Sequence, residues 1–255
     1  MPRSAAIDPR DAESDSVDVG IVFALAVEAD AFERLVERRR LTRASRFTFS
    51  TGVVATRRVA WCVCGAGRAA AAAAASQLID GHHPGLLITA GFAGGLDPGL
   101  QRGVAVRPAV VLLAPEGRKI ALVPESTTGV SAATPLTIVT TDTIAATTTD
   151  KRALAAGTGG HLVDMETFAV AEAATAAGLP CAAVRVISDD ARETLPGEVA
   201  ALAAPQSSWR RVGAVINAVG RRPGAAQDLW RLWERSVVDA RTLAAAVVEL
   251  IAQPA

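Results

Sequence analysis

The two stretches that decide the predicted fold of this chain are 161-HLVDMETFAVAEA-173 and 183-AVRVISDDA-191. The first passes from a short apolar segment into a helical run, and the second is an apolar strand that ends in Ser188, Asp189 and Asp190. In an open α/β sheet, the carboxyl ends of strands and the starts of the following helices form the ligand crevice. We therefore expect the acidic residues of both stretches at one ligand-binding edge.

The crossing from strand to helix in the first stretch carries Asp164, Met165 and Glu166. An acidic side chain is stabilised in the first turn of a helix because the unpaired N–H groups there carry partial positive charge. A lone glutamate would be explained by that preference. Here acidic residues stand at two such positions, around Glu166 and around Asp189, with one helix between them. That arrangement favours a shared function instead.

Composition excludes several classes of function. The chain has 255 residues, half of them apolar, with 26 basic and 26 acidic side chains, so no net field indicates nucleic acid or a membrane surface. No apolar run approaches the roughly 18 residues of a membrane helix. We expect a cytoplasmic protein without metal or cofactor, whose cysteines form no disulfide framework. Those cysteines are Cys62, Cys64 and Cys181.

Alternating strand and helix patterns predict one α/β domain over residues 17–255, in three layers around a central mixed sheet, after a disordered tail at 1–16. Helix Thr147–Ala156 is expected to be capped by Thr149 or Asp150, and a flap is expected after Asp190. The predicted strands are Val17–Leu25, Val59–Cys64, Leu86–Thr89, Val104–Leu113, Ile120–Val123, Leu136–Thr140 and Ala182–Ile187, with a hairpin over Phe47–Thr51 and Val53–Ala55. The other predicted helices are Ala26–Arg40, Arg68–Ile79, Pro205–Val219 and Gly224–Ala252, the last with an apolar stripe.

Two glycine-rich segments follow predicted strands. The run 65-GAGRAAA-71 approaches a dinucleotide-binding fingerprint, but the next strand ends in Ala90-Gly91 without the carboxylate that would hold a ribose. A dinucleotide-dependent oxidoreductase is therefore disfavoured. In 86-LLITAGFAGG-95 we expect a strand followed by a loop, whose glycines permit positive φ and close approach of backbone N–H groups to a ligand.

Four motifs together resemble the superfamily of purine nucleoside phosphorylases and 5′-methylthioadenosine/S-adenosylhomocysteine nucleosidases. The resemblance covers Val17–Leu202, weakens over residues 114–134, and is strongest to the hopanoid-associated phosphorylase group. It implies a nucleoside phosphorylase fold, cleavage of an N-glycosidic bond, and a homodimer or larger homo-oligomer. The motifs are 20-GIVFALAVEAD-30, 64-CGAGRAAAA-72, 90-AGFAGGL-96, and 163-VDMETFAVAEAA-174 with 184-VRVISDDA-191.

The resemblance gives Asp189 the role of the acid that protonates purine N7, with Ser188 orienting it. A departing purine anion is a poor leaving group, so protonation of the base as the bond breaks is the main available catalytic effect. An acid in that role must carry a proton near neutral pH. We therefore expect apolar surroundings for the Asp189 carboxyl.

The same resemblance assigns the residues that would bind the sugar. Glu166 would accept hydrogen bonds from the ribose 2′- and 3′-hydroxyls, and Met165 would lie flat beneath the ring as an apolar surface. The backbone at Gly91, Phe92 and Ala93 would border ribose and base.

Hydrolysis and phosphorolysis are both compatible with this reading. Glu28 lies where nucleosidases place the glutamate that activates water, although a first-turn helix acid is its simpler explanation. A phosphorylase needs a phosphate anchor, for which Gly65, Gly67 and Arg68 are the candidates. Because a carboxylate beside the nucleophile repels phosphate and suits water, we favour hydrolysis, with phosphorolysis as the alternative.

The chain departs from the nucleosidase pattern at two positions. Phe92 stands where a small serine is usual, and Ile144 replaces the aromatic residue that covers the purine. These changes bear on the substrate, which we expect to be an adenine nucleoside modified at its 5′ carbon. A non-catalytic nucleoside-binding protein is a further alternative, which the three acidic residues Glu28, Glu166 and Asp189 disfavour.

Overall fold

The computed structural model describes residues 16–43, 46–123, 135–195 and 225–253, without the side chains of 225–234. The described strands are β1 (Val19–Phe23), β2 (Glu37–Arg43), β3 (Thr48–Val54), β4 (Arg57–Val63), β5 (Leu86–Gly95), β6 (Ala105–Val106), β7 (Val110–Leu113), β8 (Arg118–Ala121), β9 (Thr137–Thr140), β10 (Leu162–Asp164) and β11 (Cys181–Asp189). The described helices are α1 (Ala26–Glu33), α2 (Arg68–His82), α3 (Thr148–Thr158), α4 (Thr167–Ala176) and α7 (Ala225–Ala252).

All described strands belong to one mixed sheet with β5 at its centre. The order runs β2-β3-β4-β1-β5-β10-β9-β7-β8, and β11 pairs with both β5 and β6. Strand β5 is parallel to β1 and β11 and antiparallel to β10. The predicted single α/β domain with a mixed sheet is therefore confirmed.

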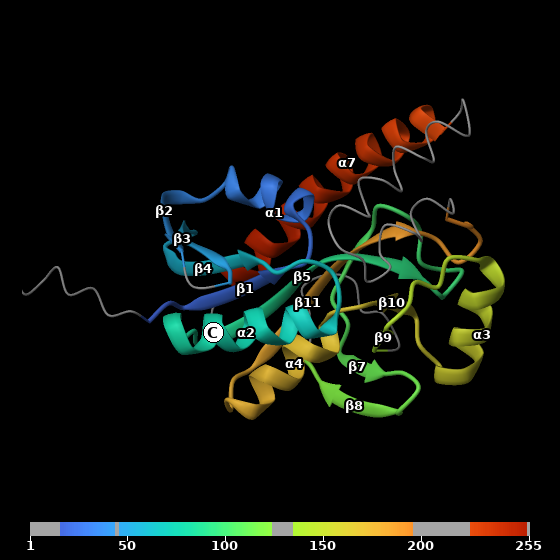
Figure 1. The fold of residues 1–255 in the computed structure, drawn as a ribbon, viewed down its shortest axis with the longest axis horizontal. Helices are drawn as coiled ribbons and strands as arrows, with labels where there is room; N and C mark the ends of the chain where they lie inside the picture. Colours follow the sequence, from blue (N-terminus) through green and yellow to red (C-terminus); the bar gives the residue numbers. More distant parts are fainter. Residues whose placement is uncertain (1–15, 44–45, 124–134, 196–224, 254–255) are drawn as a thin grey trace, which may run out of the picture.

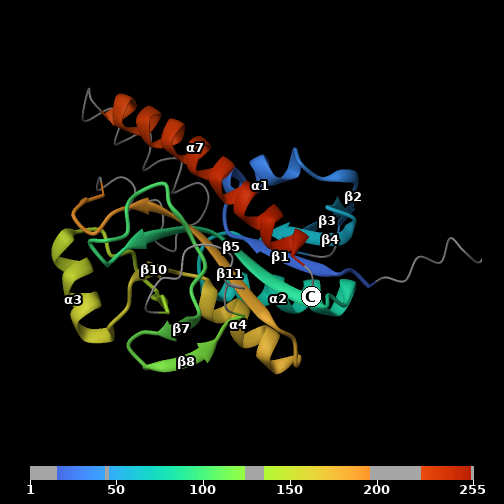
Figure 2. The same cartoon turned by 180° about the vertical axis from the view of Figure 1, so that it is seen from behind.

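Helices cover both faces of the sheet, which gives the predicted three layers (Figures 1 and 2). Helices α2 and α4 pack together on one face, and α1 and α7 on the other. One apolar cluster lies under α2 and α4 and a second under α1 and α7. Among the described residues, no helix combines the length and apolar character needed to cross a bilayer.

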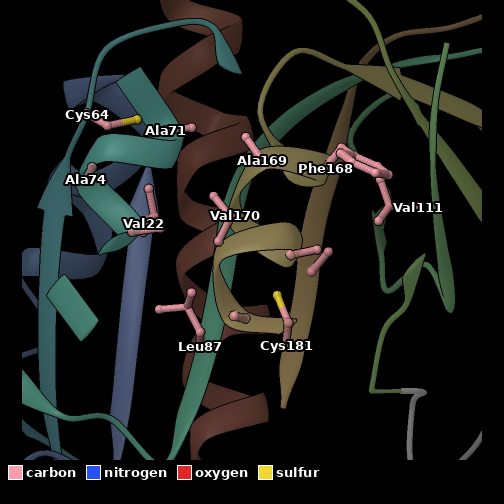
Figure 3. Packing of buried hydrophobic residues seen from close by; sticks show 14 of the residues in the cluster. Val22, Cys64, Ala71, Ala74, Leu87, Val111, Phe168, Ala169, Val170 and Cys181 are labelled. Atoms are coloured by element: carbon pink, nitrogen blue, oxygen red, sulfur yellow. The ribbon is translucent and has the colours of Figure 1, made fainter. Parts of the chain in front are cut away.

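The buried side of α2 consists mainly of alanine side chains. Ala71 and Ala74 of α2 are fully buried against the sheet residues Val22 and Leu87, and Val170 of α4 packs beside them (Figure 3). Because alanine adds little width, the helices approach the strands closely, and burial of the apolar area stabilises the contact. The alanine-rich run after the Gly65–Gly67 turn is thus a packing helix.

The glycine-dense end of β5 is strand, where a loop was expected. Strand β5 continues to Gly95, with Gly91 paired to Arg185 and Gly94 to Asp189 of β11. Pairing to β11 and β10 holds this backbone extended, so tertiary pairing overrides the weak strand propensity of glycine. Gly91 and Gly94 have no positive φ, and they supply space for side chains of the site.

The N-terminal half differs from the prediction in two further ways. Helix α1 ends at Glu33, and the residues expected to extend it form β2, an exposed edge strand with charged side chains of the kind that block edge-to-edge association. The predicted hairpin around Gly52 is the single strand β3. The turn comes later, at Ala55 and Thr56, both of which have positive φ.

Smaller corrections concern boundaries. The strand predicted at Val104–Leu113 is two strands, β6 and β7, separated around Pro108, which cannot donate to a ladder. Helix α3 is capped by Thr147, which exchanges hydrogen bonds with Asp150, so the cap lies before Thr149. The tail at 1–15, the helix Pro205–Val219 and most of the flap lie outside the described residues.

Candidate active site

A cavity of about 490 Å³ opens at the ends of β1, β5, β10 and β11. It includes apolar side chains and a group of charged ones, the combination expected of a small-molecule site. Its lining residues are Ala24, Leu25, Glu28, Ala66, Phe92, Ala93, Gly94, Arg102, Thr141, Thr143, Ile144, Ala145, Val163, Asp164, Met165, Glu166, Ser188, Asp189, Glu193, Leu195, Arg235, Ser236 and Asp239.

The structure places Glu28, Glu166 and Asp189 on the wall of this one cavity. They come from three parts of the fold: Glu28 from α1, Glu166 from the N-cap of α4, and Asp189 from the end of β11. Glu28 and Glu166 follow strands of the central sheet and Asp189 ends one, so the topology of the sheet brings their carboxylates together.

Backbone amides hold Glu28. Its Oε1 accepts a hydrogen bond from Phe92 N–H at 2.9 Å, and its Oε2 accepts from Leu25 N–H at 2.8 Å and Ala24 N–H at 3.0 Å. Burial raises the pKa of Glu28 above its ordinary 4.5, and these amides oppose that rise. A buried carboxylate with a raised pKa is a stronger base than an exposed one, which suits proton abstraction from water.

Glu166 is held by the Gly65–Gly67 turn. Gly67 N–H donates to its Oε1 at 2.6 Å, from a backbone with φ of +101° that favours glycine. Burial first, and then the charge of Asp164, raise the pKa of Glu166 to about 7. This turn therefore positions the predicted sugar-binding acid and presents an amide to it.

Asp189 lies in polar surroundings, so the expectation of apolar ones is wrong. Ser188 Oγ donates to its Oδ1 at 2.6 Å, and Lys151 Nζ donates to its Oδ2 at 2.5 Å. Lys151 comes from α3 and is fully buried. We did not predict Lys151. The one local signal was its place near the start of a helix, where the helix dipole disfavours cations. A lysine at such a position indicates a compensating anionic partner elsewhere in the fold.

A second buried ion pair lies beneath the acids. Arg185 Nη2 donates to Asp164 Oδ2 at 2.9 Å and to the hydroxyls of Thr89 and Thr167, both at 2.7 Å. The positive charge of Arg185 lowers the pKa values of Glu28 and Glu166. Arg185 was not predicted as a site residue, because the partner of an arginine inside an apolar strand becomes evident only in the fold.

The remaining predicted residues divide into two groups. Gly91 packs behind the site, where a Cβ atom would lie 2.7 Å from Glu28 Oε1. Arg68 is absent from the cavity wall, and its guanidinium makes two hydrogen bonds to Asp142, at 2.7 and 2.6 Å. Those that line the cavity are Met165, Phe92, Ala93, Ser188 and Ile144.

Helix α7 contributes charged residues that sequence reasoning missed, because its pattern indicated packing alone. Arg102 donates to Ser188 O at 2.8 Å and to Asp239 of α7 at 2.6 Å. Arg235 of α7 donates to Glu193 at 3.0 Å. Both arginines that the described residues contribute to the cavity wall are therefore paired with carboxylates.

A match over most of the chain shows its family. A family model described as the phosphorylase superfamily matches residues 18–113 and 104–219. The chain belongs to the phosphorylase superfamily. Its α/β architecture, with a central mixed sheet, is the fold of solved nucleosidases of this type.

Relatives of this superfamily member include nucleosidases. Over 90 residues it is 33% identical to the 5′-methylthioadenosine/S-adenosylhomocysteine nucleosidase of Pseudoalteromonas translucida (strain TAC 125), which covers 35% of this chain and 38% of that protein. The aligned part of the chain thus spans well under half of that relative's length.

Two solved structures illustrate the shared fold. The nucleosidase of the same description from Neisseria meningitidis, in complex with methylthio-immucillin-A, has a TM-score of 0.67 at 18% identity and covers 92% of this chain and 98% of its own. The futalosine hydrolase of Helicobacter pylori strain 26695 has a TM-score of 0.65 at 16% identity and covers 91% and 96%.

Proposed function

We propose that this protein hydrolyses the N-glycosidic bond of a purine nucleoside, adenine being the expected base, with a substituent on the 5′ carbon. The observation that carries the proposal is the convergence of Glu28, Glu166 and Asp189 on one cavity. Cleavage of this bond needs a proton for the base, a hold on the sugar and an activated nucleophile, and three acidic side chains can supply these functions.

Each acid takes one role in the proposed reaction. Glu166 binds the ribose hydroxyls, with Met165 beside it on the cavity wall as an apolar support for the sugar. Glu28, fixed by three backbone amides, takes a proton from the attacking water. Asp189 protonates the base as the bond to C1′ breaks, and the ionised acids stabilise the positive charge that develops on the sugar.

The charges of the cavity favour water over phosphate as the nucleophile. Within the described part of the chain, the arginines on the cavity wall are Arg102 and Arg235, and each is paired with a carboxylate. Arg68 is paired with Asp142 and does not line the cavity. A phosphate ion would have to break one of these pairs and approach Glu28. Phosphorolysis is the alternative that the experiment must exclude.

The proposal covers more than one 5′ substituent. Relatives act on different nucleosides by name, methylthioadenosine and S-adenosylhomocysteine in one case and futalosine in another. Phe92 and Ile144 line the cavity, so the base packs against a different surface from that of the nucleosidase pattern. We also propose that the protein forms a homo-oligomer, as the resemblance implies, and that it is cytoplasmic, as its composition and cysteine usage suggest.

A chromatographic assay of free base tests the proposal. The purified protein is incubated with 5′-methylthioadenosine, S-adenosylhomocysteine, adenosine, inosine and futalosine, each with and without phosphate. We expect free base and free sugar from at least one of them at a rate that phosphate does not change. Release that requires phosphate would establish phosphorolysis. Thermal stabilisation by adenine without release from any nucleoside would indicate a binding protein instead.

A further inference from the structure

The ion pair between Lys151 and Asp189 is buried and fully hydrogen-bonded. Lys151 Nζ donates to Asp189 Oδ2 at 2.5 Å, to the backbone oxygen of Asp190 at 2.6 Å and to that of Glu193 at 3.0 Å. The side chain of Lys151 is 1% exposed. Three acceptors thus surround the three protons of one ammonium group, with none left for water.

The same geometry accommodates the pair with the proton on either partner. If the proton moves to Asp189, the neutral amine of Lys151 keeps two N–H donors for the two backbone oxygens and accepts from the new carboxylic acid. Burial removes the water that would solvate the two groups, so hydrogen bonds within the protein take its place. An arginine could not do this, because its guanidinium does not lose a proton in proteins.

The composition of the chain points the same way. It has 24 arginines and two lysines, Lys119 and Lys151. Lys119 is exposed on β8, whereas Lys151 is the cation placed against Asp189. In an arginine-rich chain, the buried cation beside the predicted acid is thus the type that can release a proton.

We propose that Lys151 is a positioning residue for the proposed cleavage, which stores on its ammonium group the proton that Asp189 passes to the departing base. The inference rests on the proposed function and adds the source of the proton. It also gives a role to the polar groups that hold the Asp189 carboxylate, Ser188 and Lys151. Lys151 itself acts only through Asp189.

The step balances as follows. The bond between C1′ and N9 breaks and its electron pair goes to the purine, whose N7 takes a proton from Asp189. That proton first moves from the Lys151 ammonium group to the Asp189 carboxylate, and Asp189 then passes it to N7, so Lys151 ends as a neutral amine and Asp189 again as a carboxylate. The water oxygen bonds to C1′ and its proton goes to Glu28. Transfer of that proton through the cavity to Asp189, and from Asp189 to Lys151, restores the starting state.

Substitutions of Lys151 distinguish a role in supplying the proton from a purely structural role. Lys151→Arg keeps the positive charge and hydrogen-bond donors but cannot give up a proton. We expect it to fold and to bind adenine like the wild type, while kcat for an adenine nucleoside falls roughly 10²- to 10⁴-fold, as for loss of a general acid. Lys119→Arg is the matched control and should leave kcat unchanged. If Arg does not fit, Lys151→Gln, which is shorter and neutral, is expected to show the same loss.

The leaving group provides a readout that a structural role would not move. The 2-fluoroadenine analogue of the same nucleoside releases a more acidic base, which needs less protonation. We expect the rate advantage of the fluoro analogue to be about tenfold or more larger in Lys151→Arg than in the wild type. Equal losses on both nucleosides, or full kcat in Lys151→Arg, would overturn the inference and leave the proposed function standing. Absence of base release by the wild type would remove both.

Discussion

A methyl group on Gly91 would lie 2.7 Å from Glu28 Oε1, so the central strand approaches the predicted water-activating acid as closely as a glycine permits. Gly91→Ala should therefore displace the Glu28 carboxylate from its backbone amides without a conformational penalty, because Gly91 has no positive φ. We expect base release to fall by about 100-fold, the effect of a misplacement of about 1 Å. Steady-state kinetics would measure it.

Gly157→Ala is the control for that substitution. Gly157 lies in α3, where a Cβ atom would meet nothing within 4 Å, so alanine there should stabilise the helix slightly and leave activity unchanged. Unimpaired turnover in Gly91→Ala would show that the position of Glu28 does not limit the reaction.

Glu166 should make the protein less stable as the pH rises. Its pKa of about 7 in the folded state lies above the ordinary 4.5, so the folded protein binds the proton more tightly than the unfolded chain. This contribution is complete below the unfolded pKa of 4.5 and is lost as the pH rises through about 7, on the order of 3 kcal/mol in total. Urea unfolding of wild type and Glu166→Gln from pH 4 to about pH 8 would measure it.

The difference between those two proteins isolates Glu166, because Glu28 and the other acids are common to both. We expect Glu166→Gln to gain stability relative to the wild type across this range. A difference that does not change with pH would mean that Glu166 ionises in the fold as it does in water.

Arg185 should be needed for folding stability as well as for the charge balance of the site. Arg185→Met removes the cation beside Asp164, which is itself 6% exposed, and leaves its carboxylate buried without a counter-ion. Breaking a buried pair from one side costs about 3–5 kcal/mol. Denaturant unfolding would show this loss, and the pKa values of Glu28 and Glu166 should rise because the positive charge that lowers them is gone.

Arg68→Ala is the matched surface control. Its pair with Asp142 is partly exposed, with 31% and 64% of the two side chains accessible, so the expected cost is below about 1 kcal/mol. Since Arg68 does not line the cavity, its removal should also leave base release unchanged with and without phosphate. A specific loss of phosphate-stimulated activity would restore Arg68 as a phosphate anchor.

The layered fold and the acidic site could be predicted because both depend on local signals. Apolar strands followed by helical runs indicate the sheet, and Glu28, Glu166 and Asp189 stand at strand ends that such a sheet brings together. The end of β5 could not be predicted, since Gly94 and Gly95 become strand only through pairing with β10 and β11.

The polar half of the site was missed for the same physical reason. Lys151 and Arg185 stand in segments whose local pattern is helix and apolar strand, and their partners are distant in sequence. Asp239 of α7 contacts the site through Arg102 in the same way. Buried ion pairs are long-range features, so single-sequence patterns identify the carboxylates but not the cations that balance them.

The most direct test of the account is a single-turnover reaction in phosphate-free water enriched in ¹⁸O, with the preferred purine nucleoside and mass spectrometry of the released sugar. We predict free purine together with a sugar that carries one ¹⁸O atom at C1′, and none of either from Glu28→Gln on the same time scale. A sugar 1-phosphate formed only after phosphate is added, or an unchanged nucleoside, would contradict hydrolysis by these three acids.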